Sequence, residues 1–468
     1  MNKLSFRNAF LWIAGAVPAF HAAYTIPGCG PLIFIYLFCL LQLARAATGR
    51  QAFYFGLGTG LLCVAPQLTC FWFVFGPTAI VLWIILAFWI GLFVALARLC
   101  LVRFGLTGGA ILIPFIWTGL EYFRSELYYL RFSWLNVGYA LAGSAFRPVL
   151  SWAGMYGAGF FAMCVVLAVG LTLFHWRAFQ LVNPPAILLT LVILVILFLF
   201  STTEKRRLPI GKKVSVAGAQ LEFPIPIEVV ATLDKLLADD PSTELFVLSE
   251  YTFDGPVPDK VKAWCRQHQR YLIVGGKEDA PNRTFYNTAY VVGPTGDVIF
   301  RQAKSVPIQF FKDGLPALEQ KLWDSPWGKI GICICYDLSY TRVTDRLVRL
   351  GAQAIIVPTM DVADWGRRQH ELHARVAPVR AAECGIPIFR LASSGISQCV
   401  TRSGQVTASA PFPGQKATLS GTLLLGRPGS LPLDRWVAPF ATGVTGLLII
   451  WFVVTRSKRE AKGRTNDK

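Results

Sequence analysis

The stretch that decides the fold of the second half of the chain is Trp327-Gly-Lys-Ile-Gly-Ile-Cys333-Ile-Cys335-Tyr336-Asp337. Isoleucine alternates there with glycine and cysteine, and this period of two predicts a buried strand. The segment that follows, 338–351, has the pattern of an amphipathic helix that ends at a glycine. We therefore expect Cys335 to lie in an exposed turn between a strand and a helix, where the helix dipole lowers the pKa of its thiol.

A cysteine in a strand is more often a small core residue than a nucleophile, since free cysteine is among the most buried residue types. Cys333 and Cys335 are two positions apart, so strand periodicity predicts that both thiols point to the same face. The position at the strand end favours Cys335. Residues 205–430 contain an odd number of cysteines, which leaves at least one thiol free in this segment.

Hydrophobic residues make up 54% of the 468 residues, more than an ordinary soluble enzyme contains, and this predicts a membrane protein. They are concentrated in two regions, 8–201 and 436–454. A membrane-spanning helix needs roughly 20 apolar residues. By that length we expect eight spans, seven of them before a soluble segment, at 8–25, 31–46, 52–73, 77–99, 107–123, 150–174, 183–201 and 435–455.

The predicted spans divide the chain into four parts. We expect an N-terminal membrane domain with seven helices, a soluble domain, an eighth helix and a basic cytoplasmic tail, at residues 1–204, 205–430, 431–456 and 457–468.

The net charge of +18 has a pattern along the chain. Basic residues precede the first predicted span and fill the second and fourth connections and the tail, whereas the first and third connections have none. This positive-inside pattern places the N-terminus in the cytoplasm. Seven crossings then put the soluble domain on the outer, periplasmic side. We interpret the charge as a topology signal and expect no nucleic acid as a partner.

The segment 205–430 alternates predicted strands with predicted helices, which indicates an α/β sandwich. The strands are expected at 214–220, 244–250, 271–276, 354–358 and 387–391, with two more inside 285–303. The helices are expected at 226–238, 259–270 and 367–384.

Two charged residues follow predicted strands of this domain. Glu250 ends a strand, where partial burial raises the pKa of a carboxyl and suits it to accept a thiol proton. Lys304 follows the strand that ends at Ala303, where its ammonium would favour a thiolate and stabilise an oxyanion. Taken singly, each is more often a solvated surface residue. Together with Cys335, they predict a nucleophilic catalytic site.

The order Glu, Lys, Cys, each at a strand end, resembles the carbon–nitrogen hydrolase (nitrilase) superfamily. The spans around such a domain resemble its apolipoprotein N-acyltransferase family. Strings similar to motifs of that family are Trp117–Arg124, Phe132–Tyr139, Ile334–Asp337, Arg380–Pro387 and Arg390–Ser397. The resemblance implies an α-β-β-α sandwich inserted before the last membrane helix, in the inner membrane of a bacterium.

The resemblance also implies a mechanism without a cofactor. Glu250 takes the proton of Cys335, and the thiolate attacks the ester of a membrane phospholipid while Lys304 and backbone amides hold the oxyanion. The acyl chain then passes through a thioester to the N-terminal amine of a lipoprotein, the expected second partner. The further residues expected near the site are Tyr336, Asp337, Gln309, Trp365 and Ser394. Phe310, Phe311 and Trp365 are interpreted either as an apolar lid or as core.

Three positions depart from the family pattern. The family usually has a glutamate shortly after the lysine, where this chain has Gln309 and no carboxylate before Asp313. Glutamate is common in the family at the position of Asp337, and asparagine at that of Ser394. The departures leave open a TraB-type paralogue linked to conjugal-transfer or envelope machinery. They also leave open an amidase or nitrilase-type hydrolase, and a non-catalytic scaffold.

Two further patterns are weaker indications of function. The string His370-Glu371-Leu-His373 is similar to a zinc-binding helix, but that site needs histidines four apart and these are three apart, so we expect no metal. Glu121 and Arg124 lie three apart at a predicted membrane edge. Charges there often mark function, and a structural ion pair is an equal alternative.

Overall fold

The computed structural model describes residues 4–174, 211–414 and 416–466. The chain divides into two compact units, Met1–Phe200 with Leu433–Lys468, and Ser201–Pro432. We call them the membrane unit and the sandwich unit. The seventh predicted span, 183–201, lies outside the described residues.

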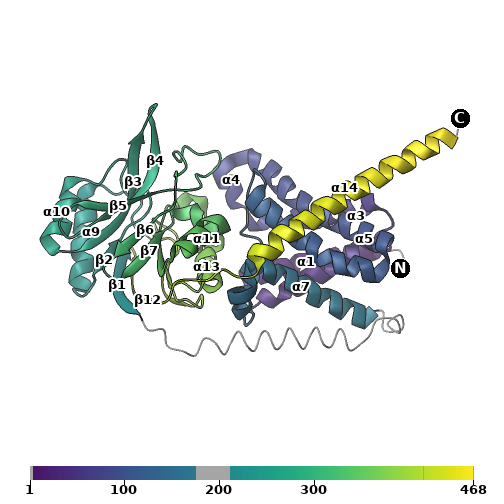
Figure 1. The fold of residues 1–468 in the computed structure, drawn as a ribbon, viewed down its shortest axis with the longest axis horizontal. Helices are drawn as coiled ribbons and strands as arrows, with labels where there is room; N and C mark the ends of the chain where they lie inside the picture. Colours follow the sequence, from purple (N-terminus) through teal and green to yellow (C-terminus); the bar gives the residue numbers. More distant parts are fainter. Residues whose placement is uncertain (1–3, 175–210, 415, 467–468) are drawn as a thin grey trace. The chain divides into compact units, whose positions relative to one another are not determined.

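The described part of the membrane unit is helical (Figure 1). Its helices are α1 (Phe6–Thr25), α2 (Ile33–Leu43), α3 (Gly49–Gln67), α4 (Cys70–Phe75), α5 (Ala79–Tyr122), α6 (Val137–Leu141), α7 (Leu150–Phe174) and α14 (Asp434–Asn466). Short 3-10 or π turns lie at Gly30–Leu32, Gly76–Thr78, Phe123–Leu127 and Arg147–Val149. Among the described residues, the stretches long and apolar enough to cross a membrane are Cys70–Leu127, Arg147–Gly170 and Asp434–Thr455.

Two of the predicted spans, 77–99 and 107–123, are joined in α5 without a separate loop. The helix changes direction at Gly105, which has a φ of +73° inside an otherwise helical run. Glycine adopts this left-handed conformation without the steric penalty that other residues meet. The connection between the two spans is therefore a break at a single residue.

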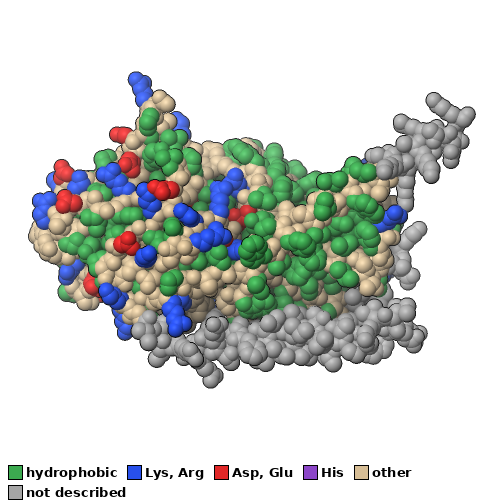
Figure 2. Space-filling model, viewed as in Figure 1, with side chains coloured by type: hydrophobic (Ala, Val, Ile, Leu, Met, Phe, Trp, Pro, Cys, Tyr) green, Lys and Arg blue, Asp and Glu red, His purple; other side chains and the backbone are tan. Residues whose placement is uncertain are grey.

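Large apolar side chains are exposed along α14, where Trp436 is 82% and Leu447 is 69% exposed. In the space-filling view, hydrophobic side chains cover much of the visible face of the membrane unit, whereas most of the charged side chains belong to the sandwich unit (Figure 2). A helix surface of this kind is stable against lipid rather than water.

The sandwich unit contains two six-stranded sheets, in the orders β12-β1-β2-β3-β4-β5 and β11-β10-β9-β8-β7-β6. In each sheet three neighbouring strands are parallel, β1-β2-β3 and β7-β8-β9, and the outer strands are antiparallel. The strands are β1 (Lys212–Ala219), β2 (Leu245–Val247), β3 (Tyr271–Ala280), β4 (Thr284–Val292), β5 (Val298–Ala303), β6 (Leu322–Ser325), β7 (Gly328–Ile332), β8 (Ala354–Thr359), β9 (Ile388–Ala392), β10 (Ser397–Val400), β11 (Val406–Ala410) and β12 (Thr418–Leu425).

Helices cover both outer faces of the paired sheets (Figure 1). The first sheet carries α9 (Pro226–Asp239) and α10 (Asp259–His268), and the second carries α11 (Thr341–Leu350), α12 (Arg367–Ala374) and α13 (Val376–Cys384). One apolar core lies between the sheets and includes Val216, Ile332 and Phe389. This confirms the predicted α-β-β-α sandwich. The helix predicted at 367–384 is instead two helices, separated at Arg375.

Candidate active site

The three predicted catalytic side chains follow strands that end in one region of the sandwich unit. Glu250 lies three residues after β2, Lys304 directly after β5, and Cys335 three residues after β7. Lys304 Nζ donates to Glu250 Oε1 at 2.8 Å. The Cys335 thiol also interacts with the Glu250 carboxylate. The structure therefore brings all three side chains together around Glu250.

Lys304 is fully buried between two carboxylates. Its Nζ lies 2.8 Å from Glu250 Oε1 and 2.7 Å from Asp313 Oδ2. Burial alone would lower the pKa of Lys304, but the two carboxylates more than offset this and hold the pKa well above its ordinary value. The ammonium stays charged, as an oxyanion partner must.

Glu250 accepts hydrogen bonds with both oxygens. Oε1 accepts from Asn287 Nδ2 at 2.6 Å as well as from Lys304, and Oε2 accepts from the backbone N–H of Met360 at 2.8 Å. Burial raises the pKa of Glu250 above its ordinary value, against the opposing effect of Lys304, and the charge of Asp313 adds to the rise. A raised pKa suits a carboxyl that must accept a proton and give it back.

Asp313 supplies a second carboxylate, which the sequence pattern does not predict at this site. Its Oδ2 contacts Lys304 and accepts from Ile308 N, and its Oδ1 accepts from Tyr251 Oη and Asn287 Nδ2, each at 2.9 Å. Burial would raise the pKa of Asp313, but Lys304 lowers it below the ordinary value. Of the two carboxyls on Lys304, Glu250 is the one that can hold a proton. The chain therefore places a carboxylate on its lysine even though residue 309 is glutamine.

The predicted exposure and pKa of Cys335 are wrong. Cys335 is only 2% exposed, and burial, followed by the charge of Glu250, raises the pKa of its thiol well above the ordinary value. It begins a short 3-10 turn, Cys335–Ser339, and α11 starts only at Thr341, so the expected helix N-terminus is not at the sulfur. The thiol is neutral at rest, and it must pass its proton to a base at the moment of reaction.

The predicted common face of the two neighbouring cysteines is also wrong. β7 ends at Ile332, and Cys335 has a φ of +52°, so the alternation of a strand does not reach it. The groups that act on the Cys333 thiol are Asp337, Cys384 and Arg380. Those that act on the Cys335 thiol are Glu250, Lys304 and Asp361. The two thiols therefore face different surroundings, and only Cys335 faces the glutamate and lysine.

Asp337 joins the cysteine turn to the segment after Lys304. Its fully buried carboxylate accepts from Ser305 N at 3.0 Å, Val306 N at 2.7 Å and Ile334 N at 3.2 Å. Burial raises the pKa of Asp337 to about 6, although these amides and Lys304 lower it. Asp337 therefore fixes the spacing between the lysine and the cysteine.

Three of the other predicted residues lie in partly buried positions. The Tyr336 ring packs against Tyr340 at 5.1 Å between centroids. Trp365 lies 6.3 Å from Phe311, between ring centroids. Gln309 is half-buried. Phe310 and Phe311 are 67% and 42% exposed, so these two do not belong to the core.

Ser394 helps to connect three loops of the sandwich unit. Its hydroxyl donates to Glu222 Oε2 at 2.5 Å, and the same oxygen accepts from Ala363 N at 3.0 Å. The loops after β1, β8 and β9 are thereby held together.

Donor atoms of Cys335, Asp361 and His373 lie within 4.8 Å of one another. Arg390 Nη2 contacts both Asp361 Oδ2, at 2.5 Å, and His373 Nδ1, at 3.0 Å. A cation would have to displace this guanidinium. We therefore interpret the group as a hydrogen-bond network.

In the membrane unit, Glu121 and Arg124 are both buried, and the ion pair that is one of the two alternatives for them is not formed. Glu121 Oε1 accepts from Val137 N at 2.9 Å. Arg124 donates to Phe132 O at 3.0 Å and to Asn136 Oδ1 at 2.6 Å. The two side chains hold the connection that follows α5.

Two family models match the chain. Residues 11–168 match the apolipoprotein N-acyltransferase N-terminal domain, and residues 237–423 match the carbon–nitrogen hydrolase domain. The chain is 26% identical over 496 residues to the apolipoprotein N-acyltransferase of Geobacter metallireducens, covering 93% of each protein.

Other relatives match a smaller part of the chain. The chain is 26% identical to a deaminated glutathione amidase of Dictyostelium discoideum, over 34% of this chain and 62% of that protein. It is also 26% identical to a formamidase of Bacillus cereus, over 30% of this chain and 52% of that protein. Among solved structures, Nit3 of Saccharomyces cerevisiae matches with a TM-score of 0.40 and 20% identity, over 46% of this chain and 90% of that one. With a membrane domain and a hydrolase domain that both match, and with similarity along nearly its whole length, the chain belongs to the apolipoprotein N-acyltransferase family of the carbon–nitrogen hydrolase superfamily.

Proposed function

We propose that this protein is a membrane acyltransferase that moves an acyl chain from a phospholipid, through a thioester on Cys335, to the N-terminal amine of a lipoprotein. The observation that carries the proposal is the meeting of a buried thiol, a carboxyl of raised pKa and a charged lysine around Glu250. The similarity to a lipoprotein N-acyltransferase over 93% of the chain supplies the substrate classes.

In the first half-reaction, Glu250 takes the thiol proton of Cys335 as the sulfur attacks the ester carbonyl of the phospholipid. The carbon–oxygen bond to the glycerol breaks, and Glu250 gives its proton to the departing oxygen. The products are a thioester and a lysophospholipid. Lys304 Nζ stabilises the negative oxygen of the tetrahedral intermediate, because its charge is fixed before the substrate arrives.

In the second half-reaction, the α-amine of the lipoprotein attacks the thioester carbonyl. Glu250 takes a proton from the amine, the carbon–sulfur bond breaks, and the proton returns to the sulfur. An amide forms, and Cys335 and Glu250 regain their starting states. The raised pKa values of the two groups suit this cycle. The Cys335 thiol keeps its proton before and after the reaction, and the Glu250 carboxylate is basic enough to take that proton and return it.

The proposal includes the topology expected from the sequence. Eight spans would anchor the protein in the inner membrane of a bacterium, with the sandwich unit on the periplasmic side. The apolar stretches of the described residues and the exposed apolar side chains of α14 support a membrane location. Attachment of a cysteine-reactive, membrane-impermeant label to positions in the connections would test the orientation.

The decisive experiment is mass spectrometry of the purified protein after incubation with phospholipid and no acceptor. We expect an added acyl mass on the peptide that carries Cys335, and its loss when a lipoprotein peptide with a free amine is added. Cys335→Ala should remove the adduct. Cys333→Ala is the matched control, because that thiol faces away from Glu250 and Lys304, and it should retain the adduct. Equal labelling of both variants would refute the assignment.

A hydrolase is the second candidate, because about a third of the chain is similar to a deaminated glutathione amidase and to a formamidase. Water would then take the place of the amine in the second half-reaction. Release of free fatty acid at the same rate with and without acceptor would favour hydrolysis. A non-catalytic scaffold role in conjugal-transfer machinery stays a prediction, and complementation of a transfer defect by the Cys335→Ala protein would favour it.

A further inference from the structure

Met360 touches both groups that would exchange the proton. Its backbone N–H donates to Glu250 Oε2 at 2.8 Å, and its carbonyl oxygen accepts from Cys335 Sγ at 3.6 Å. Met360 directly follows β8 and precedes Asp361. The alignment of base and thiol therefore depends on what holds the backbone at this point.

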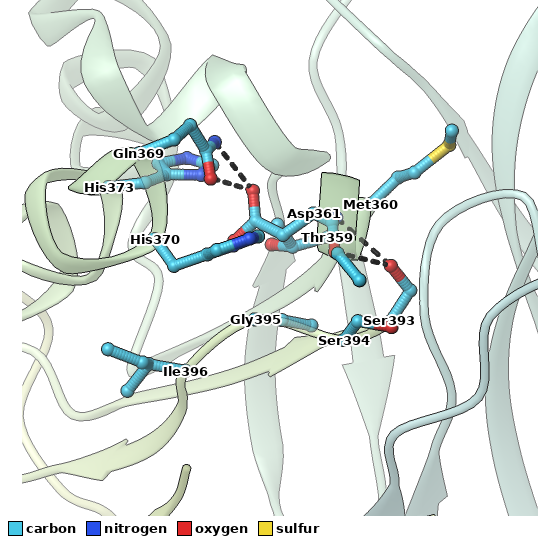
Figure 3. A network of polar contacts seen from close by, with 12 residues as sticks. Thr359, Met360, Asp361, Gln369, His370, His373, Ser393, Ser394, Gly395 and Ile396 are labelled. Carbon is cyan, nitrogen blue, oxygen red and sulfur yellow. Dashed lines mark hydrogen bonds and ion pairs between the residues drawn. The ribbon is translucent and has the colours of Figure 1, made fainter. Parts of the chain in front are cut away.

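Asp361 is fully buried and is held by several elements (Figure 3). Its Oδ1 accepts from Gln369 Nε2 at 3.0 Å and from His373 Nδ1 at 2.8 Å, where the carboxylate can only accept and the imidazole must donate. Its Oδ2 accepts from Arg390 Nη2 at 2.5 Å. Its backbone N–H donates to Ser393 Oγ at 3.0 Å, and that hydroxyl donates to Asp361 O at 3.1 Å. Side chain and backbone of Asp361 are thus both fixed.

Gly395 shows how closely the chain packs around this carboxylate. A Cβ at Gly395 would lie 2.6 Å from Asp361 Oδ2 and 2.9 Å from His370 Nδ1. Only glycine allows this approach.

The charge of Asp361 matters to the thiol. A carboxylate oxygen of Asp361 lies within 4.8 Å of Cys335 Sγ, and a negative charge at this distance opposes loss of the thiol proton. Burial alone would raise the pKa of Asp361, but His373 and Arg390 more than offset this and hold the pKa well below the ordinary value, so the carboxylate is ionised.

Arg390 is the cation that balances Asp361. Burial lowers the pKa of His373, against the opposing effect of Asp361, so the imidazole is neutral near pH 7. The groups that act on the Cys335 thiol are Glu250, Lys304 and Asp361. Those that face Asp361 are Arg390, His373 and, with Nδ1 at 3.9 Å, His370.

We propose that Asp361 and Arg390 form a charge-balanced positioning pair, which holds the Met360 peptide against Glu250 and Cys335 and keeps the Asp361 charge from suppressing ionisation of the thiol. Neither residue contacts the reacting atoms. The pair acts on thiol reactivity itself, so the inference does not depend on whether the acceptor is an amine or water.

The test is the pH dependence of alkylation at Cys335, followed by mass spectrometry of its peptide after iodoacetamide treatment of the full-length protein in detergent. Asp361→Asn leaves the arginine charge unbalanced, and it should lower the midpoint by about one pH unit. Arg390→Met leaves the carboxylate unbalanced, and it should raise the midpoint by about one pH unit. Arg390→Lys keeps a positive charge at this position, so its alkylation midpoint should lie close to that of the unchanged protein.

Opposite shifts distinguish this role from a structural one, because loosened packing would change access to the thiol in the same direction in both variants. The matched control is Glu383→Gln. This also replaces a buried carboxylate bonded to a buried arginine, Glu383 Oε2 to Arg380 Nη1 at 2.6 Å, but it lies outside the groups that act on Cys335. We expect no shift in this control.

Shifts in the same direction, or no shift in either variant, would overturn the proposal. If Arg390→Met does not fold, the isosteric variant Asp361→Asn tests the proposal by itself. An unchanged or raised alkylation midpoint in that variant would contradict the proposed positioning pair. Alkylation requires no acyl donor, so this result is independent of the proposed acyl transfer.

Discussion

Each unit of the molecule buries a basic side chain, but the two treat its charge differently. Lys304 of the sandwich unit is fully buried and contacts two carboxylates, at 2.8 and 2.7 Å. Arg124 of the membrane unit is 8% exposed and donates to two neutral oxygens, those of Phe132 and Asn136.

This difference suggests a catalytic role for the first side chain and a structural role for the second. A lysine between carboxylates of unequal pKa belongs to a group that can move a proton, since one carboxyl is poised to take it and the other stays charged. An arginine on backbone and amide oxygens fixes the path of the chain. We therefore assign the reaction to the sandwich unit and a structural role to the Glu121 and Arg124 motif.

The largest expected effect comes from removing the cation of the sandwich unit. Lys304→Met leaves Glu250 and Asp313 buried without a counter-charge. We expect a loss of about 3–5 kcal/mol of stability and of at least about 10³-fold in acyl transfer, measured by thermal unfolding and by turnover. Lys312→Met, on the exposed part of the same segment, is the control and should change neither. A Lys304→Met protein that keeps a tenth of its activity would remove the lysine from the mechanism.

Asp313→Asn sharpens the assignment of the two carboxylates. The charge of Asp313 raises the pKa of Glu250, so its removal should lower that pKa. The acid limb of the pH–rate profile should then move down by about one pH unit, with a rate about 10- to 100-fold lower at the optimum because the lysine loses a partner. An upward movement of the limb would show that Glu250 is not the base.

Asp337 gives a test through stability. Its pKa of about 6 exceeds the ordinary value, so the folded protein binds the proton more tightly than the unfolded chain does. This contribution is present below about pH 4 and is lost as the pH rises through about 6. The stability of the unchanged protein relative to Asp337→Asn should therefore fall by about 2 kcal/mol between pH 4 and pH 7. A rise over the same interval would mean that the backbone amides outweigh burial.

The smallest effect on activity is expected in the membrane unit. Arg124→Gln loses a charge-assisted contact with the connection after α5, and should cost about 1–2 kcal/mol of stability. Activity per folded molecule should stay within about twofold, because no reacting group contacts this side chain in the proposed mechanism. Normal stability with lost turnover would break the comparison, and would assign Arg124 to substrate handling.

Much of the sandwich could be predicted from local sequence. Strands such as β3 and β8 are continuous apolar runs, and helices such as α10 have an apolar face, so their patterns are readable without knowledge of the fold. β6, β10, β11 and β12 were missed. β12 pairs with β1, about two hundred residues earlier in the chain, and its pattern of burial is irregular. Its place depends on a partner that no local window contains.

In the candidate site, too, some residues could be predicted from local sequence and others depend on the tertiary fold. Glu250, Lys304 and Cys335 could be found because each follows a readable strand. The contact of Asp313 with Lys304 and that of Arg390 with Asp361 could not be predicted, because these residues reach the site through a long segment and a different strand. The pKa of the thiol was predicted with the wrong sign. A turn and a helix start were visible in the sequence, but the burial of Cys335 beside Glu250 and Asp361 comes from the tertiary fold.

The φ of +52° at Cys335 has a consequence for the thermal stability of the protein. A residue with a Cβ is strained in this region, and glycine is not. Among inert variants, Cys335→Gly should therefore be more heat-resistant than Cys335→Ala, the reverse of the usual ranking of these two residues. The residue proposed as the nucleophile therefore carries a strained backbone conformation, and this strain lowers the thermal stability of the protein.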